Sequence, residues 1–301
     1  MSGAHHETNA FNFSRAFAIG IGLNVAFVAI EAFYGLTADS MALLADAGHN
    51  LSDVLGLVLA WGAGMLCQRP PSERFTYGLR RTSILAALAN AMILMTVVGG
   101  IAWESILRFG APAPVAEHTV IAVALIGAVI NTATALLFAS GREYDLNIRG
   151  AFVHMAADAA ISVGVAISGV LILYTGWLWL DPAVSLAIVV VILIGTWDLL
   201  RDSFSLILDA VPAGVDVRAI ESYLRSLPSV TEVHDLHVWG MSTTETALSA
   251  HLVRSEATCD DAFLARAHHE LKARFGIGHA TLQLETGDTA HPCALAPDHL
   301  V

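Results

Sequence analysis

Charged residues and cysteines are both scarce in this chain of 301 residues. Charged side chains make up 14% of the sequence, whereas an ordinary soluble domain carries roughly 25%. Because this deficit coincides with long apolar runs, it places the chain among membrane proteins. The net charge of −12 gives no reason to expect nucleic acid as a partner. Three cysteines are too few and too scattered for a disulfide framework.

Six apolar segments account for the high hydrophobic content. Each is long enough to provide the ~20 residues that a helix needs to cross the hydrocarbon of a bilayer. A helix satisfies its own backbone hydrogen bonds in lipid, so each segment is predicted to be a spanning helix. The six-helix, all-α membrane domain is expected over residues 14–206. Its spans are 14–35, 40–66, 82–107, 118–139, 151–174 and 178–200.

Arginines are concentrated on one side of the predicted spans. The loops after the second and fourth spans hold six of them, whereas only Arg108 lies on the other side. The positive-inside rule therefore places both termini in the cytoplasm, with residues 1–13 as a short tail. No small-residue cleavage site follows a short apolar core near the start, so we expect no cleavable signal peptide. The six arginines are Arg69, Arg74, Arg80, Arg81, Arg142 and Arg149.

The pattern changes after the sixth span. Amphipathic and alternating stretches in residues 207–287 predict the order α-β-β-α-β, a small ferredoxin-like α+β domain with an antiparallel sheet. About 80 residues support only a small core, so dimerisation would stabilise the domain. Residues 288–301 are expected to form a C-terminal tail. The predicted elements are 211–227, 230–239, 246–253, 260–275 and 281–285.

Ionisable residues inside two of the spans point to a function. His49 and Asp53 in the second span, and His154 and Asp158 in the fifth, are each separated by four residues and so share a helix face. Two imidazoles and two carboxylates can surround Zn²⁺ tetrahedrally, and the carboxylates balance its charge. Protons would compete with the metal for these groups.

Alternative interpretations apply to single members of this set. One His–Asp pair could be an ordinary hydrogen bond between helices, although two pairs with identical spacing are harder to explain in that way. Asp46 lies three residues before His49. It could be an accessory metal ligand, orient His49, carry a proton or be solvated in a cavity.

Three stretches of the sequence together resemble the cation diffusion facilitator family, which includes bacterial zinc, cobalt and cadmium efflux proteins and the animal ZnT transporters. The first is Leu44–Asp53, the second is Asn147–His154 followed by Asp158, and the third is Val233–Trp239. The resemblance covers nearly the whole chain. It implies six spans, a cytoplasmic ferredoxin-like domain, a homodimer and metal/proton antiport.

The resemblance also implies a transport site. That site consists of His49, Asp53, His154 and Asp158, and histidine at position 49 is similar to the zinc-type branch. Two features depart from the family pattern. The loop of residues 140–149 lacks the histidines that many relatives carry there, and Ser83 stands near a position where many have glutamate.

The cytoplasmic domain is rich in histidine. By resemblance, a regulatory site for Zn²⁺, Co²⁺ or Cd²⁺ would consist of His237, His251, His279 and Glu285, with His234 and His268 as competitors. Strand alternation predicts that His234 and His237 face opposite sides of the sheet. Several of these histidines could instead be ordinary surface residues. His291, Cys293 and His299 could form a second cluster, although a frayed terminus is the simpler interpretation, and His5 and His6 could deliver metal.

The sequence therefore predicts a homodimeric, multi-pass exporter of a divalent transition metal, foremost Zn²⁺, in a bacterial inner membrane. Metal and protons would be exchanged by alternating access, which would confer metal resistance. A preference for Co²⁺, Cd²⁺ or Ni²⁺ is an alternative within the same class. An intramembrane metalloenzyme is disfavoured because no His-Glu-x-x-His motif is present and four protein ligands leave no place for an activated water. Six spans would be excessive for a membrane-anchored metal sensor, the remaining alternative.

Overall fold

The computed structural model describes residues 22, 25–139, 146–255, 261–287, 290 and 293–296. The chain divides into two compact units. The first contains the described residues up to Leu59 together with Ala89–Asp198, and the second contains Ala60–Leu88 and the described residues from Leu199 onward.

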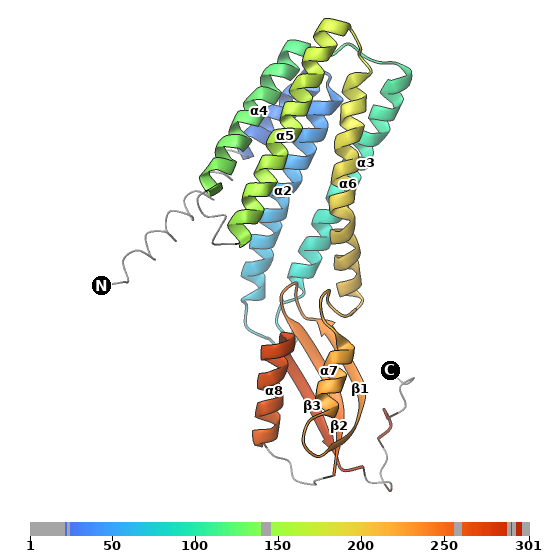
Figure 1. Ribbon diagram of the computed structural model, residues 1–301. Coiled ribbons are helices and arrows are strands. Elements are labelled where there is room, and N and C mark those ends of the chain that lie inside the picture. The colour runs from blue at the N-terminus through green and yellow to red at the C-terminus, as the bar shows by residue number, and fades with distance from the viewer. Residues whose placement is uncertain are drawn as a thin grey trace, which may run out of the picture. The chain divides into compact units, whose positions relative to one another are not determined.

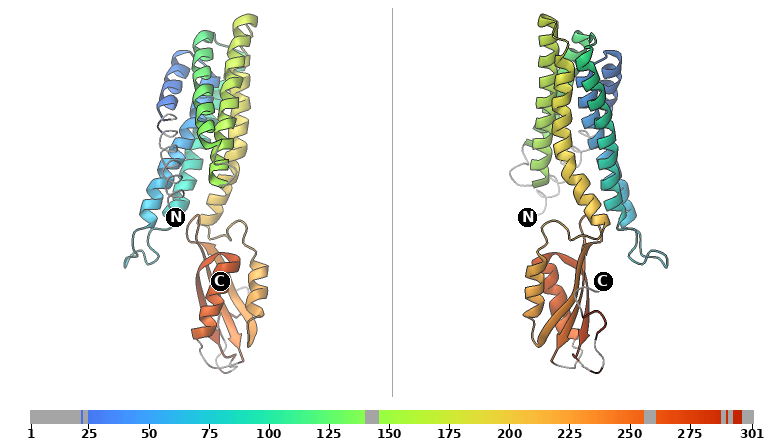
Figure 2. Two further views of the ribbon diagram at one scale, coloured as in Figure 1. Left: turned by 60° about the vertical axis from the view of Figure 1, so that its left-hand side comes forward. Right: turned by 90° about the vertical axis from the view of Figure 1, so that its right-hand side faces the viewer.

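Five helices are long and apolar enough to cross a membrane, which confirms five of the predicted spans. The first predicted span lies partly outside the described residues, and its described part forms the shorter apolar helix Val25–Thr37. In Figures 1 and 2, α4 and α5 run side by side along their length. The long helices are α2 (Met41–Cys67), α3 (Thr82–Gly110), α4 (Glu117–Ala139), α5 (Leu146–Thr175) and α6 (Leu180–Ile207).

One apolar core joins the helices of the first unit. Every one of them contributes a buried side chain, from Phe27 in the first helix to Ile192 in α6. Gly127 in α4 permits a close approach, because a Cβ atom at that position would lie 2.5 Å from the Phe27 ring. Small residues at such crossings allow membrane helices to pack closely.

A buried carboxylate fixes the start of α2. Asp181, near the start of α6, accepts hydrogen bonds from the backbone N–H of Met41 at 2.7 Å and from the Ser40 hydroxyl at 2.5 Å. The Ser40 hydroxyl in turn caps the helix by accepting from the backbone N–H of Leu43 at 3.3 Å. These contacts satisfy backbone donors that would otherwise be unpaired at the helix terminus, and they tie α2 to α6.

The second unit contains a three-stranded sheet with two helices. The strand order is β1-β2-β3, with β1 antiparallel to β2 and β2 parallel to β3. The α-β-β-α-β order is confirmed, but the sheet is mixed rather than antiparallel, because α8 forms a crossover that returns β3 in the direction of β2. The elements are α7 (Val217–Arg225), β1 (Val230–Gly240), β2 (Thr246–Arg254), α8 (Asp261–Phe275) and β3 (Ile277–Glu285).

Both helices of this domain cover one face of the sheet. Leu224 of α7 and Phe263 of α8 share a core with Val238, Leu248 and other strand residues that point to that face. The residues that alternate with them, including His251, therefore lie on the helix-free face.

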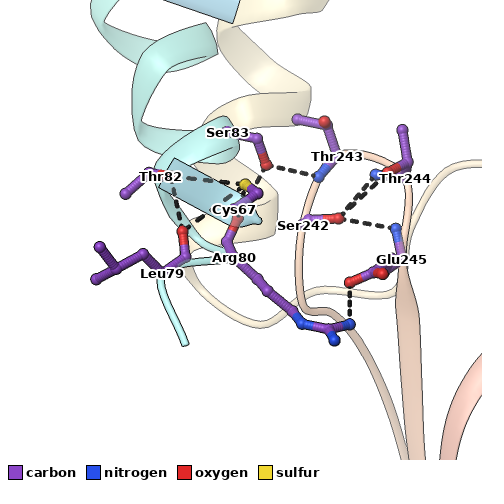
Figure 3. A network of polar contacts seen from close by, with 9 residues as sticks. All are labelled: Cys67, Leu79, Arg80, Thr82, Ser83, Ser242, Thr243, Thr244 and Glu245. Atoms are coloured by element: carbon purple, nitrogen blue, oxygen red, sulfur yellow. Dashed lines mark hydrogen bonds and ion pairs between the residues drawn. The ribbon is translucent and has the colours of Figure 1, made fainter. Parts of the chain in front are cut away.

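The connection between α2 and α3 contacts the β1–β2 turn within the same unit (Figure 3). Arg80 forms an ion pair with Glu245, and the Ser83 hydroxyl accepts a hydrogen bond from the backbone N–H of Thr243 at 3.1 Å. Nearby, Arg81 pairs with Asp209. Ser83 therefore has a structural role in this connection.

The cap at the start of α2 generates a stability prediction. Asp181→Ala should lower the free energy of unfolding by about 1–3 kcal/mol, because it leaves buried N–H and hydroxyl donors without an acceptor. Thermal unfolding in detergent measures the change. Asp198→Ala removes an exposed carboxylate from the same helix and should shift the midpoint far less. Equal shifts in the two variants would contradict the capping role.

Candidate metal centres

The first candidate metal centre lies between α2 and α5. His49 and Asp53 come from α2, and His154 and Asp158 come from α5. The i, i+4 spacing stacks each pair on one helix face, and the two faces meet. The shortest contacts cross between the helices: His49 Nε2 lies 3.2 Å from Asp158 Oδ1, and His154 Nε2 lies 3.1 Å from Asp53 Oδ2.

The separations between these atoms fit a small divalent cation. One ligand atom each from His49, Asp53 and Asp158 lies within 4.8 Å of the other two. His154 adjoins this group, with Nε2 also 3.7 Å from Asp158 Oδ2. Zinc–ligand bonds of 2.0–2.2 Å place tetrahedral ligands about 3.4 Å apart. The contacts therefore need only small adjustments to close around one ion.

Exposure is graded across this centre. The side chain of Asp158 is 1% exposed, whereas that of His154 is 42% exposed. His49 and Asp53 lie between these values. One side of the centre is therefore enclosed by protein and the other is open, as a site that loads and releases an ion requires.

Asp46 is buried beside this centre but belongs to a different group of side chains. Its carboxylate accepts a hydrogen bond from the Ser162 hydroxyl at 3.0 Å and contacts the carboxyl group of Glu31. Glu31 is also fully buried and accepts a hydrogen bond from the Asn50 side chain at 3.1 Å. Glu31 lies inside the first apolar segment of the sequence, and the presence of an acid there is the signal that could have pointed to it.

The second candidate metal centre lies on the helix-free face of the cytoplasmic sheet. His234 on β1 and His251 on β2 stand directly opposite each other, with ring centroids 5.2 Å apart. Glu285 on β3 reaches both, at 3.0 Å from His251 Nδ1 and 3.5 Å from His234 Nε2. Ligand atoms of these three residues and of Cys293 all lie within 4.8 Å of one another.

A β-bulge in β1 shapes this centre. The register shifts between His234, opposite His251, and His237, opposite Ser249, and Asp235 at the shift has φ 51°. The extra residue turns His234 and His237 to the same face. The predicted opposite orientation of these histidines is therefore wrong, because simple alternation does not account for a bulge.

The bulge also places an orienting carboxylate. Asp235 Oδ2 lies 3.5 Å from His251 Nε2, which leaves the Nδ1 atom directed at Glu285. Carboxylates behind metal-binding imidazoles fix their orientation in this way. His237 Nε2 lies 2.9 Å from the other oxygen of Asp235.

The surroundings of the Glu285 carboxyl group favour its ionised form. Burial opposes its charged form. Hydrogen bonds from Cys293 and Gln283 and the positive charge of His234 and His251 nevertheless hold the pKa of its carboxyl below the ordinary value. A charged carboxylate beside imidazoles that can be neutral favours binding of a divalent cation.

The other ligands predicted for the cytoplasmic domain lie outside this cluster. His237 is half-exposed, His268 is exposed on α8, and His279 is exposed and packs edge-on against Tyr77 with ring centroids 5.5 Å apart. His5, His6, His291 and His299 lie outside the described residues. Of the predicted set, the structure thus brings together His251, Glu285 and the competitor His234. It adds Cys293, for which the sequence offered a second cluster with His291 and His299 or, as the simpler interpretation, a frayed terminus.

Family models of known proteins match nearly the whole chain. Residues 17–208 match the family model of the cation efflux transmembrane domain, and residues 212–287 match that of the cation efflux protein cytoplasmic domain. The metal cation efflux system protein CzcD of Cupriavidus metallidurans is 32% identical over 98% of this chain and 93% of its own length.

Two further relatives show similar coverage. The cadmium, cobalt and zinc/H⁺-K⁺ antiporter of Bacillus subtilis is 32% identical over 96% of this chain and 94% of its own length. The zinc transporter ZitB of Escherichia coli is 34% identical over 95% of this chain and 93% of its own length. The resemblance deduced from the three motifs is confirmed, and the chain belongs to the cation diffusion facilitator, or cation efflux, family.

Proposed function

We propose that this multi-pass membrane protein exports a divalent transition metal, foremost Zn²⁺, from the cytoplasm in exchange for protons. The observation that carries the proposal is the convergence of His49, Asp53, His154 and Asp158 between two membrane helices. Ionisable groups are costly inside a bilayer and mark ion pathways. The names of the relatives, which include zinc transport and metal cation efflux, support the same function.

Charge balance explains how the ion would enter the membrane. Two carboxylates neutralise one divalent cation, so the loaded centre carries no net charge and its transfer through the low-dielectric interior costs less. The open side at His154 would admit the ion from the cytoplasm. A movement of α2 and α5 would then expose it to the opposite side.

Proton exchange follows from the ligands themselves. Metal binding requires neutral imidazoles and ionised carboxylates, so it releases protons, and protonation weakens the site. Protons entering from outside would displace the ion and restore the empty centre. The naming of the Bacillus subtilis relative as a zinc/H⁺-K⁺ antiporter supports this exchange.

A wider cation range is a second candidate function. A site with two nitrogen and two oxygen ligands also accepts Co²⁺, Cd²⁺ and Ni²⁺. The Bacillus subtilis relative is named for cadmium and cobalt as well as zinc. A metalloenzyme is less well supported, because four protein ligands leave no coordination position for an activated water.

Asp46 and Glu31 are proposed as a proton-holding pair beside the transport centre. Two carboxyl groups in contact and away from water hold a shared proton, and a cation in the adjacent centre would favour their ionised forms and drive the release of that proton. Asp46 already bonds to Ser162 and contacts Glu31, so a role as direct metal ligand is less well supported.

The cytoplasmic domain is proposed as a metal-responsive dimerisation domain. His234, His251 and Glu285 would bind the same class of cation when it is abundant and promote transport. The domain matches a family model that is named for dimerisation, which supports a homodimer. The arginine-rich loops support cytoplasmic termini, and the compact loops support a bacterial inner membrane.

The transport centre is tested by Asp158→Asn. The neutral amide removes a ligand and half of the balancing charge, so the initial rate of Zn²⁺ uptake into everted vesicles should fall by about 10–100-fold or more. Asp198→Asn, which changes an exposed carboxylate on α6, is the matched control and should transport normally. A wild-type rate in Asp158→Asn would refute the site.

The proton-holding pair is tested by Asp46→Asn. A pH-stat titration of the protein in detergent with Zn²⁺ should release about one proton fewer per ion than the wild type, while Zn²⁺ affinity stays within a few-fold. Glu31→Gln should give the same reduced count. An unchanged proton count together with affinity weakened tenfold would make Asp46 a ligand instead.

The regulatory role is tested by His234→Ala. Removal of a buried ligand should weaken metal binding to the cytoplasmic domain by about 10–100-fold. It should also abolish the stimulation of transport at high cytoplasmic Zn²⁺. The basal rate should remain. His268→Ala changes an exposed histidine of α8 and should keep the stimulation. Retained stimulation in His234→Ala would exclude the cluster from regulation.

A further inference from the structure

We propose that the Cys293 thiolate is the fourth ligand of the cytoplasmic metal centre. The sulfur would make this centre a nitrogen–oxygen–sulfur site that is selective for soft cations. This inference rests on the proposed function of the cytoplasmic centre and extends it. The transport centre offers only nitrogen and oxygen atoms, so the two centres of the chain would differ in ligand softness.

The sulfur of Cys293 lies among the other candidate ligand atoms of this centre. Cys293 Sγ lies 3.4 Å from His251 Nδ1 and makes a hydrogen bond to the Glu285 carboxylate. Bonds of 2.3 Å to sulfur and 2.0–2.1 Å to nitrogen separate tetrahedral S and N ligands by about 3.6 Å. The observed separation is therefore close to that of two ligands of one zinc ion.

His234 is buried in this centre with ring nitrogens that are unsatisfied within the described part of the chain. Its side chain is 4% exposed, and neither ring nitrogen has a hydrogen-bond partner among the described residues. A buried imidazole without a partner is costly unless something else satisfies it. The Nε2 atom lies 3.5 Å from Glu285, inside the cluster, so a metal ion at the centre would supply the missing interaction.

The backbone just after β3 passes close to β2 at a glycine. Gly287 has φ 69°, a conformation that side chains disfavour, and a Cβ atom there would lie 3.0 Å from the Val253 side chain. A glycine is therefore needed where the chain passes close to β2. This passage precedes Cys293.

The binding step balances in charge and protons. The thiol loses its proton to solvent, the sulfur forms a bond to the cation, and no electron is transferred. One thiolate and the Glu285 carboxylate then neutralise a divalent ion held also by two neutral imidazoles. Sulfur favours Zn²⁺, Cd²⁺ and Co²⁺ over Mg²⁺, Ca²⁺ and Mn²⁺. The centre would thus bind the abundant hard cations of the cytoplasm much more weakly than it binds soft cations.

Cobalt spectroscopy of the full-length protein in detergent tests the assignment. Co²⁺ bound to a thiolate gives a sulfur-to-metal charge-transfer band in the near ultraviolet that nitrogen and oxygen ligands do not give. The Cys67→Ser/Cys259→Ser double variant keeps Cys293 as its only cysteine and should show the band at full intensity. Cys293→Ser should lose it and bind Cd²⁺ in the tail at least about tenfold more weakly.

Alkylation supplies a second readout that does not depend on a variant folding. Saturating Zn²⁺ should slow maleimide labelling of Cys293 about tenfold or more, as measured by mass spectrometry, and should leave labelling of Cys67 unchanged. His234→Ala should remove the protection.

The outcomes separate this inference from the proposed function. A wild-type protein that binds metal in its tail, as judged by His234→Ala, but shows no charge-transfer band and no protection of Cys293 would overturn the sulfur ligand alone. A tail that binds no metal in either assay would overturn both the sulfur ligand and the regulatory centre.

Discussion

The structure depends on the cost of placing carboxylates in a membrane interior. Asp158 is almost completely enclosed between helices, and Asp53 lies close by. Two such charges are stable only with protons or a cation beside them. The paired histidines supply nitrogen ligands of borderline softness and cross between α2 and α5, so a cation that neutralises the carboxylates also joins the two helices. Metal binding and the proposed movement of these helices would therefore be coupled by the same contacts.

A related constraint applies to the cytoplasmic sheet. Its helices cover one face, and the other face carries His234, His251 and Glu285. The bulge at Asp235 brings a histidine and its orienting carboxylate into position on one strand. Different local features thus bring the side chains of the two candidate centres together. Helical i, i+4 spacing does so in the membrane domain, and a strand bulge does so in the sheet domain.

The parts of this arrangement that follow from local periodicity could be predicted from the sequence. Five spans and the His–x–x–x–Asp pairs are visible because helix geometry relates residues only four positions apart. The parallel pairing of β3 and the shared orientation of His234 and His237 could not be predicted, because they depend on a crossover and a register shift. The approach of Cys293 to His251 could not be predicted for a similar reason, because the two residues are 42 positions apart in the sequence.

The family resemblance implied several candidate ligands in the cytoplasmic domain, and the structure brings only some of them together. His279 lies opposite Ala247, four residues from His251 along β2, whereas Glu285 lies opposite Val253, only two residues from it. Strand register therefore decides which of several plausible ligands can meet. Sequence motifs alone do not fix that register.

A structure of the Zn²⁺-loaded protein in lipid nanodiscs, determined by electron cryo-microscopy, tests the central claim most directly. The account predicts one ion between α2 and α5, bound by a nitrogen of His49 and of His154 and by oxygens of Asp53 and Asp158. A loaded protein with the ion bound elsewhere in the membrane domain, and with these four side chains turned away from one another, would contradict it.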